Sequence, residues 1–157
     1  MDANLKTSID EKLKALELEK KLFSKAMILY RTGLRPKNIS SAQFSAISAR
    51  IERAPNVIKA KGRVEGFLRN QLEKLSKKQK RGLQESWLKP PDISSEYKSL
   101  GELAIAWIKH DRYLPEQGQL NEKENLAVLR RFWGLLSGLY SYEMTFQKGM
   151  PIKEEAA

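Results

Sequence analysis

The chain has 157 residues, no cysteine and a formal net charge of +10, and its residues are 41% hydrophobic and 31% charged. This composition is typical of a soluble globular protein, and the lack of cysteine excludes disulfide bonds and thiolate metal sites. No apolar run approaches the roughly 18 residues that a membrane-spanning helix needs, and the N-terminus does not resemble a signal peptide. We therefore expect a cytoplasmic protein with no membrane partner.

A first helix is predicted over residues 9–31. Ser8 and Glu11 have the spacing of a capping box at its start, and Gly33 followed by Pro36 indicates its end. Apolar residues recur within it at three- and four-residue spacing, which places them on one helix face. The positions predicted to face the core are Ile9, Leu13, Leu16, Phe23, Met27 and Tyr30.

Two helices are predicted in the middle of the chain. One covers residues 42–53 with Ser41 as its N-cap, and the other covers residues 57–78 with Asn56 as its N-cap. Pro55 separates them. Their apolar stripes comprise Phe44, Ile47 and Ile51 in the shorter helix and Val57, Ala60, Val64, Phe67, Leu68 and Leu75 in the longer one.

Gly62 and Gly66 lie about one turn apart in the longer of these two helices. Each glycine weakens a helix by roughly 1 kcal/mol relative to alanine, so a structural reason for the pair is expected. The spacing indicates either a close crossing with another helix or a bend.

A break in the helical pattern follows. Residues 83–88 are predicted to form a short helical turn, and Lys-Pro-Pro-Asp at 89–92 is the strongest linker pattern, because two successive prolines cannot continue a helix. The chain is therefore expected to form one domain over residues 1–157, which could consist of two lobes, residues 1–88 and 92–157.

The last two helices are predicted over residues 100–110, with Ser99 as N-cap, and over residues 122–148, with Asn121 as N-cap and Glu124 completing a capping box. No segment alternates apolar and polar residues as a half-buried strand would. We expect an all-α fold, a bundle of about five helices. Four aromatic residues fall on apolar stripes and are predicted to lie in the core, namely Trp107, Phe132, Trp133 and Tyr140.

The sequence contains no catalytic motif. Because His110 is its single histidine, a zinc helix with two histidines is impossible, and the lack of cysteine excludes a Cys–His nucleophile. There is no phosphate-binding glycine loop, no dinucleotide-binding fingerprint and no nucleophile elbow. We expect a protein that is not an enzyme and that uses no metal and no cofactor.

The positive charge is concentrated in the middle of the chain. Residues 31–90 hold 15 basic and 4 acidic side chains, whereas residues 1–30 have a net charge of +1 and residues 91–157 have a net charge of −2. This asymmetry indicates a localised contact with a polyanion rather than a general aid to solubility.

The longer middle helix has a basic face. At 100° per residue its basic residues fall within about 60° of one another, and its apolar stripe is centred roughly 120° away. Since arginine and lysine bind phosphate, the pattern predicts a site for the backbone of DNA or RNA, with little readout of base sequence. The residues assigned to this site are Lys59, Arg63, Asn70, Lys74 and Lys77 on that helix, Arg50 and Arg53 on the helix before it, Arg31, Arg35 and Lys37 further upstream, and Lys80 and Arg81 downstream.

Two points are left open by the residues alone. The basic segment could be a solvated lysine-rich surface with no ligand. Its seven arginines and its small number of acidic residues favour a polyanion site instead. Trp87 lies beside the basic run and the linker, so a surface role in stacking on a base, or in packing on a neighbouring subunit, is an alternative to burial.

An all-helical chain of this size, with a basic middle and no catalytic residues, resembles the small helical subunit of CRISPR Cascade-type effector complexes. The resemblance covers the whole chain as a profile and includes no signature motif. It implies an architectural role in antiviral defense, in which copies of the subunit stack along a guide–target duplex within a ribonucleoprotein and hold a strand by its backbone. Its partners would be nucleic acid, other subunits of the complex and copies of itself.

Two other classes of protein remain possible. The chain could be a stand-alone DNA- or RNA-binding protein, with a helix-turn-helix formed across the short connection at 54–56, and such a protein should select base sequence. It could also be an adaptor whose basic face binds an acidic protein, which should show no salt-dependent affinity for oligonucleotides.

Overall fold

The computed structural model describes residues 3–78, 86–93, 96–114 and 120–149, and over these residues the protein is all-helical, as predicted. Five α-helices and one 3-10 turn occur in this part of the chain, and no strand. They are α1 (Ala3–Thr32), α2 (Ser41–Arg53), α3 (Val57–Lys78), η2 (Ser86–Leu88), α4 (Leu100–Lys109) and α5 (Glu122–Gly149). Of the short helical turn predicted at 83–88, residues 83–85 lie outside the described residues.

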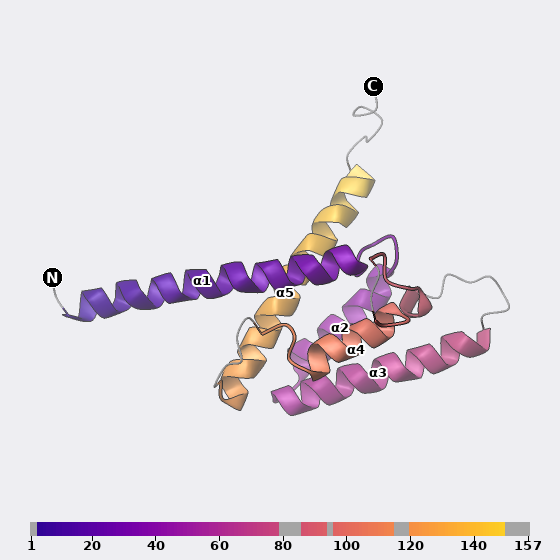
Figure 1. Ribbon diagram of the computed structural model, residues 1–157, viewed down its shortest axis with the longest axis horizontal. Coiled ribbons are helices and arrows are strands. Elements are labelled where there is room, and N and C mark those ends of the chain that lie inside the picture. Colours follow the sequence, from indigo (N-terminus) through magenta and orange to yellow (C-terminus); the bar gives the residue numbers. More distant parts are fainter. Residues whose placement is uncertain (1–2, 79–85, 94–95, 115–119, 150–157) are drawn as a thin grey trace, which may run out of the picture.

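The helices form two groups (Figure 1). The helices α2, α3 and α4 lie together, with α3 packed against both α2 and α4, whereas α5 crosses α1 and packs against it. The N-terminal half of α1 extends away from the other helices. The helix α3 also contacts η2 and α5, and the exposed part of its surface includes Lys59, Arg63 and Lys74.

Three of the predicted N-caps are confirmed by their hydrogen bonds. The side chain of Asn56 accepts from the backbone N–H of Lys59 at 2.8 Å, and that of Ser99 accepts from Glu102 N–H at 3.2 Å. Asn121 and Glu124 form the reciprocal capping box, with distances of 2.8 and 3.1 Å. These caps satisfy backbone donors that a helix start leaves without partners, so α3, α4 and α5 begin where predicted.

Two predicted helix starts are wrong. The first helix begins at Ala3 and runs through Ser8, because residues 3–8 contain neither glycine nor proline to interrupt it. The second begins at Ser41, with Ser40 as its N-cap in a capping box with Gln43. Both serines suit the N-cap position, but only Ser40 has a glutamine three residues later to complete the box.

The buried face of α1 also differs from the prediction. Leu22, Ala26 and Leu29 are its core residues, whereas Leu16 is 58% exposed and Phe23 is 42% exposed. Leu16 and Phe23 do follow helical spacing, but α5 and the α1–α2 loop cover a face about a quarter-turn away from them. Of the other predicted core positions, Met27 and Tyr30 are half-buried, and the side chains of Ile9 and Leu13 lie outside the described residues.

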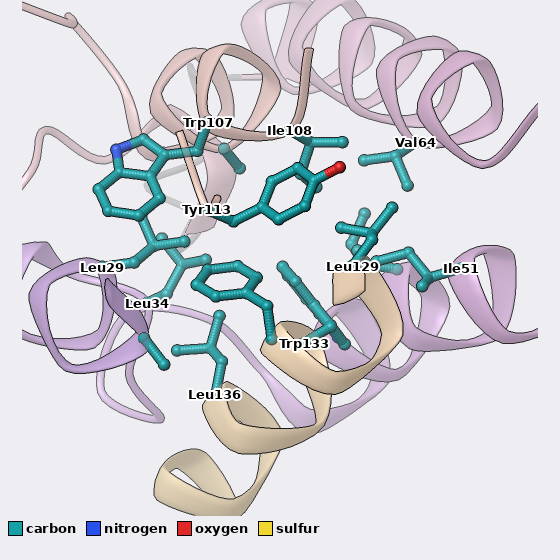
Figure 2. Packing of buried hydrophobic residues seen from close by; sticks show 14 of the residues in the cluster. Leu29, Leu34, Ile51, Val64, Trp107, Ile108, Tyr113, Leu129, Trp133 and Leu136 are labelled. Atoms are coloured by element: carbon teal, nitrogen blue, oxygen red, sulfur yellow. The ribbon is translucent and has the colours of Figure 1, made fainter. Parts of the chain in front are cut away.

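Aromatic residues join the helices into one core (Figure 2). The ring of Phe44 on α2 stacks against Trp133 and Tyr140 of α5, with centroid distances of 5.0 and 4.3 Å. Phe132 of α5 lies between Trp107 and Tyr113, at 6.1 and 5.6 Å. Trp107, Phe132, Trp133 and Tyr140 are all buried, as predicted.

The close helix approach occurs at Gly101 and not at the predicted glycine pair. A Cβ built on Gly101 would lie 2.9 Å from Leu72 Cδ2, so the lack of a side chain lets α4 approach α3. At Gly62 and Gly66 an added Cβ would meet nothing within 4 Å, and both residues are exposed. The prediction of a close crossing at these two residues is therefore wrong.

The segment around the two prolines is held against the end of α1. Asp92 N–H donates to Thr32 O at 2.7 Å, and Leu100 N–H donates to Lys89 O at 2.8 Å. Trp87 is fully buried in the common core, so the predicted surface role for this residue is wrong. The core contains residues from both sides of this segment.

Candidate nucleic-acid interface

A groove lies between α2 and α3 and has a volume of about 550 Å³. None of the residues that line it is acidic, and four of them were predicted to contact nucleic acid. We call this feature the α2–α3 groove. It is lined by Ala49, Arg50, Arg53, Arg63, Gly66, Phe67 and Asn70.

Arg50 is held in a fixed position inside the groove. Its guanidinium carbon lies 4.0 Å from the centroid of the Phe67 ring, and its Nη1 donates to Ala46 O at 2.9 Å. The cation–π contact and the hydrogen bond to its own helix together restrain the plane of the guanidinium. Arg50 therefore has fewer rotamers to lose when a ligand binds than a free surface arginine has.

A second arginine connects the two walls of the groove. The Nη1 atom of Arg63, on α3, donates to the backbone oxygen of Arg53, the last residue of α2, at 3.5 Å. Neither side chain forms an ion pair with any residue that the structure describes. Both positive charges are therefore available to an anion from solution.

The groove continues along α3 as the predicted basic face (Lys59, Arg63, Asn70, Lys74 and Lys77). All five residues are exposed. Lys77 pairs with Glu73 at 3.3 Å, but both side chains are well exposed, and a pair of this kind contributes only about 0.3–0.5 kcal/mol. Lys59 and Lys74 have no ion pair within the described ranges. Lys77 is thus only weakly held, and the other cations of the face are free.

Other basic residues of α3 have acidic partners. Arg69 pairs with Glu65 at 2.8 Å, and Lys109 of α4 reaches the same carboxylate at 3.5 Å. These contacts lower the pKa of Glu65, chiefly through the hydrogen bond from Arg69. Lys61 pairs with Asp111, in the turn after α4. The basic residues on the side of α3 toward α4 thus have carboxylate partners, whereas among the described residues those that line the groove have none.

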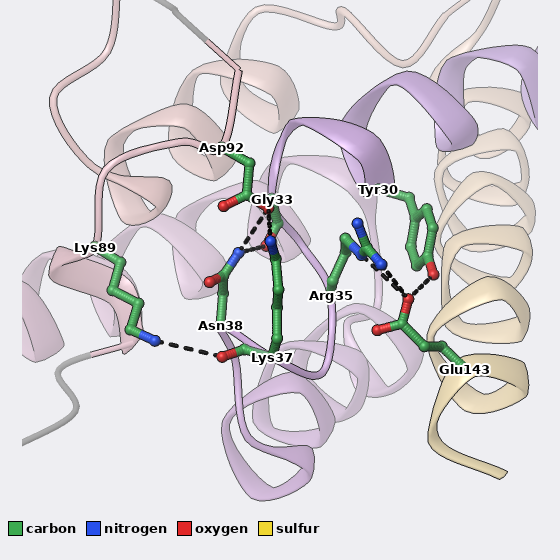
Figure 3. Close-up of polar contacts among 8 residues, drawn as sticks. All are labelled: Tyr30, Gly33, Arg35, Lys37, Asn38, Lys89, Asp92 and Glu143. Atoms are coloured by element: carbon green, nitrogen blue, oxygen red, sulfur yellow. Dashed lines mark hydrogen bonds and ion pairs between the residues drawn. The ribbon is translucent and has the colours of Figure 1, made fainter. Parts of the chain in front are cut away.

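The predicted site residues Arg35 and Lys37 belong to a different environment (Figure 3). Arg35 donates from Nε and Nη2 to Glu143 Oε1 at 3.1 and 2.7 Å, and Lys37 pairs with Asp92 at 3.2 Å. Both residues lie in the loop between α1 and α2, where their partners come from α5 and from the segment before α4. The structure therefore does not bring these two cations into the groove.

The cluster around Glu143 perturbs two pKa values. Tyr30 donates to the same carboxylate oxygen as Arg35, and burial together with this acidic neighbour raises the pKa of Tyr30 to about 12. The hydrogen bond to Glu143 raises the pKa of Arg35 above its usual value. Tyr30 and Arg35 therefore bind the same carboxylate of α5, which links the end of α1 and the following loop to α5.

The remaining three predicted residues do not contribute to the described groove. Arg31 is exposed near the end of α1 and does not line it, and Lys80 and Arg81 lie outside the described residues. Of the twelve residues assigned from the sequence, four line the groove and three more continue it along α3.

Two groove residues were not predicted as part of the site. Phe67 was assigned to the apolar stripe of its helix, yet its half-buried ring supports Arg50. Gly66 was predicted to mark either a close helix crossing or a bend, yet it lines the groove and leaves it open. At 100° per residue Phe67 lies between the apolar stripe and the basic face, whereas Gly66 lies on the side of the basic face away from the apolar stripe, so no common sequence signal marked the two residues as part of the site.

Arg130 of α5 binds the end of α2. Its guanidinium donates to the backbone oxygens of Ile51, Glu52 and Ala54, at 3.4, 2.9 and 2.8 Å. These oxygens belong to the last turn of α2 and to its C-cap residue Ala54, where the helix has no further N–H groups of its own to bind them. Arg130 therefore fixes the end of α2 that carries Arg53.

The described residues contain no group of three or more histidine, aspartate or glutamate side chains placed to hold a metal ion. His110 is exposed at the end of α4, where its backbone N–H donates to Ala106 O at 3.0 Å. No helix in the described ranges is both long enough and apolar enough to cross a membrane.

Comparison of the chain with protein-family models, with curated proteins and with solved structures finds no significant match.

Proposed function

We propose that the protein binds nucleic acid by its sugar–phosphate backbone, in the α2–α3 groove and along the basic face of α3. The observation that carries the proposal is the pairing of the cations. Basic residues on the α4 side of α3 and in the α1–α2 loop have carboxylate partners, whereas those of the groove and most of the face have none among the described residues. Cations that line one groove without carboxylate partners are suited to phosphates.

The proposed role is structural and not catalytic. Phosphate contacts position a strand but carry no information about its base sequence. The resemblance to the small helical subunit of CRISPR Cascade-type complexes extends the proposal. The chain would hold a DNA or RNA strand within a ribonucleoprotein made of other subunits and copies of itself, while base pairing reads the sequence.

The test is fluorescence anisotropy with labelled DNA and RNA oligonucleotides of unrelated sequence, across a series of salt concentrations. We expect similar affinity for all sequences of one strand type. The logarithm of affinity should fall with the logarithm of salt concentration, with a slope of about −0.7 for each phosphate contact on a single strand.

A double variant locates the site. Arg53→Glu with Arg63→Glu should weaken binding at least tenfold and reduce the single-strand salt slope by about 1.4, because two phosphate contacts are lost. The matched control is Lys14→Glu with Lys20→Glu, which changes the net charge equally at two exposed positions of α1. If both double variants lost the same affinity and kept their helix content, binding would depend on the overall net charge and not on the groove. Binding to an acidic protein but to no oligonucleotide at low salt would identify an adaptor instead.

A further inference from the structure

We infer that the α2–α3 groove holds an unpaired nucleobase against the guanidinium of Arg50, so that the protein prefers single-stranded to double-stranded nucleic acid. This inference deepens the proposed function and rests on it. It adds a contact to the base, which is independent of sequence, to the phosphate contacts already described.

The first argument is the stacking surface. The Arg50 guanidinium lies over the Phe67 ring at 4.0 Å and is tied to Ala46 O at 2.9 Å. Planar guanidinium groups and aromatic rings are the surfaces on which proteins stack splayed-out bases. Here the plane is already oriented in the absence of a ligand, and both groups line an open groove. A stacked base would also tolerate any sequence, since every base has a π-face.

The second argument is the space and the chemistry around this surface. A volume of about 550 Å³ lies within the range of roughly 300–1,000 Å³ found for small-ligand sites. Gly66 contributes no side chain beside the stack, and the amide of Asn70 offers donors and an acceptor for a base edge. Arg53 and Arg63 line the same groove and can bind the phosphates on either side of that base.

Strand preference follows from these two arguments. In a duplex the bases are paired and stacked on one another, and a base must first be unstacked before it can enter a protein site. A single strand presents its bases without that cost. The groove therefore gains a base contact with a single strand and only phosphate contacts with a duplex.

The decisive variant fills the groove without weakening the helix. Gly66→Leu places a side chain in the groove, and leucine favours a helix more than glycine does. Gly62→Leu is the matched control, because Gly62 is equally open on the same helix but does not line the groove. We expect Gly66→Leu to lower the affinity for labelled oligothymidylate about tenfold, with duplex affinity unchanged. Gly62→Leu should change neither.

A second measurement removes the base instead of the space. An oligonucleotide with abasic sites should bind the unmodified protein about tenfold more weakly than oligothymidylate of the same length. Arg50→Lys, which keeps the charge but loses the planar group, should remove this difference, and Arg53→Lys should retain it. Equal binding of the abasic and normal strands, or an equal effect of Gly66→Leu on single strands and duplexes, would overturn the inference and leave the proposed function standing. Absence of binding to every oligonucleotide at low salt would overturn both.

Discussion

The α2–α3 groove and the loop between α1 and α2 are both rich in basic residues, but their cations have different partners. In the groove, Arg53 and Arg63 face solvent without a carboxylate among the described residues, and Arg50 lies on an aromatic ring. In the loop, Arg35 binds Glu143 and Lys37 binds Asp92. Basic composition thus identifies a segment of the chain, whereas the partner of each cation distinguishes a ligand site from a structural contact.

The largest expected effect on stability is at Gly33, in the loop. Its φ of 151° is unfavourable for other residues, and an added Cβ would come within 2.5 Å of Leu100 Cδ2 in the core. We predict that Gly33→Ala lowers the free energy of unfolding by about 2–4 kcal/mol, from backbone strain and overpacking together. Chemical denaturation measures this directly. An unchanged denaturation midpoint would show that the loop is less rigidly held than its contacts indicate.

Removal of single arginines should separate the two regions most clearly. Arg35→Ala removes the guanidinium that binds the mostly buried Glu143, and we predict a loss of about 1–3 kcal/mol in unfolding free energy. Arg63→Ala should change stability by less than about 0.5 kcal/mol, because its side chain has no acidic partner in the described part of the chain. For oligonucleotide affinity we expect the reverse order, with a larger loss for Arg63→Ala than for Arg35→Ala. If both variants were equally destabilised, the distinction between the two regions would not hold.

The glycines of α3 should respond in the opposite sense to Gly33. Gly62→Ala and Gly66→Ala place a methyl group in open space and improve helix propensity. Each should raise the free energy of unfolding by up to about 1 kcal/mol. Thermal and urea denaturation of the two single variants and the double variant test this, and additive gains are expected. Destabilisation by either variant would show that the added methyl group meets a neighbouring atom and that the space beside that glycine is not open.

A further predicted effect is a pH dependence in the loop region. The pKa of Tyr30 is raised from 10.0 to about 12, which means that the folded protein favours the neutral phenol. The contribution of Tyr30 to stability is therefore complete below pH 10 and is lost as the pH rises through 12. Tyr30→Phe should make stability fall less steeply across this interval. In the ultraviolet absorbance titration of tyrosinate, the variant should lack one late-titrating group, and an unchanged titration would contradict the assignment.

Much of the fold could be predicted because its signals are local. Asn56, Ser99 and Asn121 each precede a helix and cap it through atoms three residues away. Helix bounds in the second half of the chain were therefore predicted to within a residue. The start of α1 was not, because Ser8 and Glu11 have the spacing of a capping box although no residue interrupts the helix before them.

Features that depend on distant residues could not be predicted from spacing. The partner of Arg35 lies 108 residues away, so the sequence could not distinguish this cation from Arg53 or Arg63. The buried side of α1 is decided by where α5 and the loop lie, and not by the α1 residues alone. Four groove residues were predicted because the concentration of positive charge and the basic helix face are local features of the sequence. Phe67 and Gly66 became recognisable only with the groove itself.

The contact of Arg130 with the last turn of α2 has an electrostatic consequence. The carbonyl end of a helix carries a partial negative charge equivalent to roughly half an electron, and this end of α2 carries Arg53 at the groove. A guanidinium bound to three of these oxygens compensates that charge from the side of α5. The end of the helix dipole that would repel an approaching anion is thereby masked, and the potential in the groove is determined by its arginines. A basic residue that never touches a ligand can in this way influence how strongly the ligand is attracted.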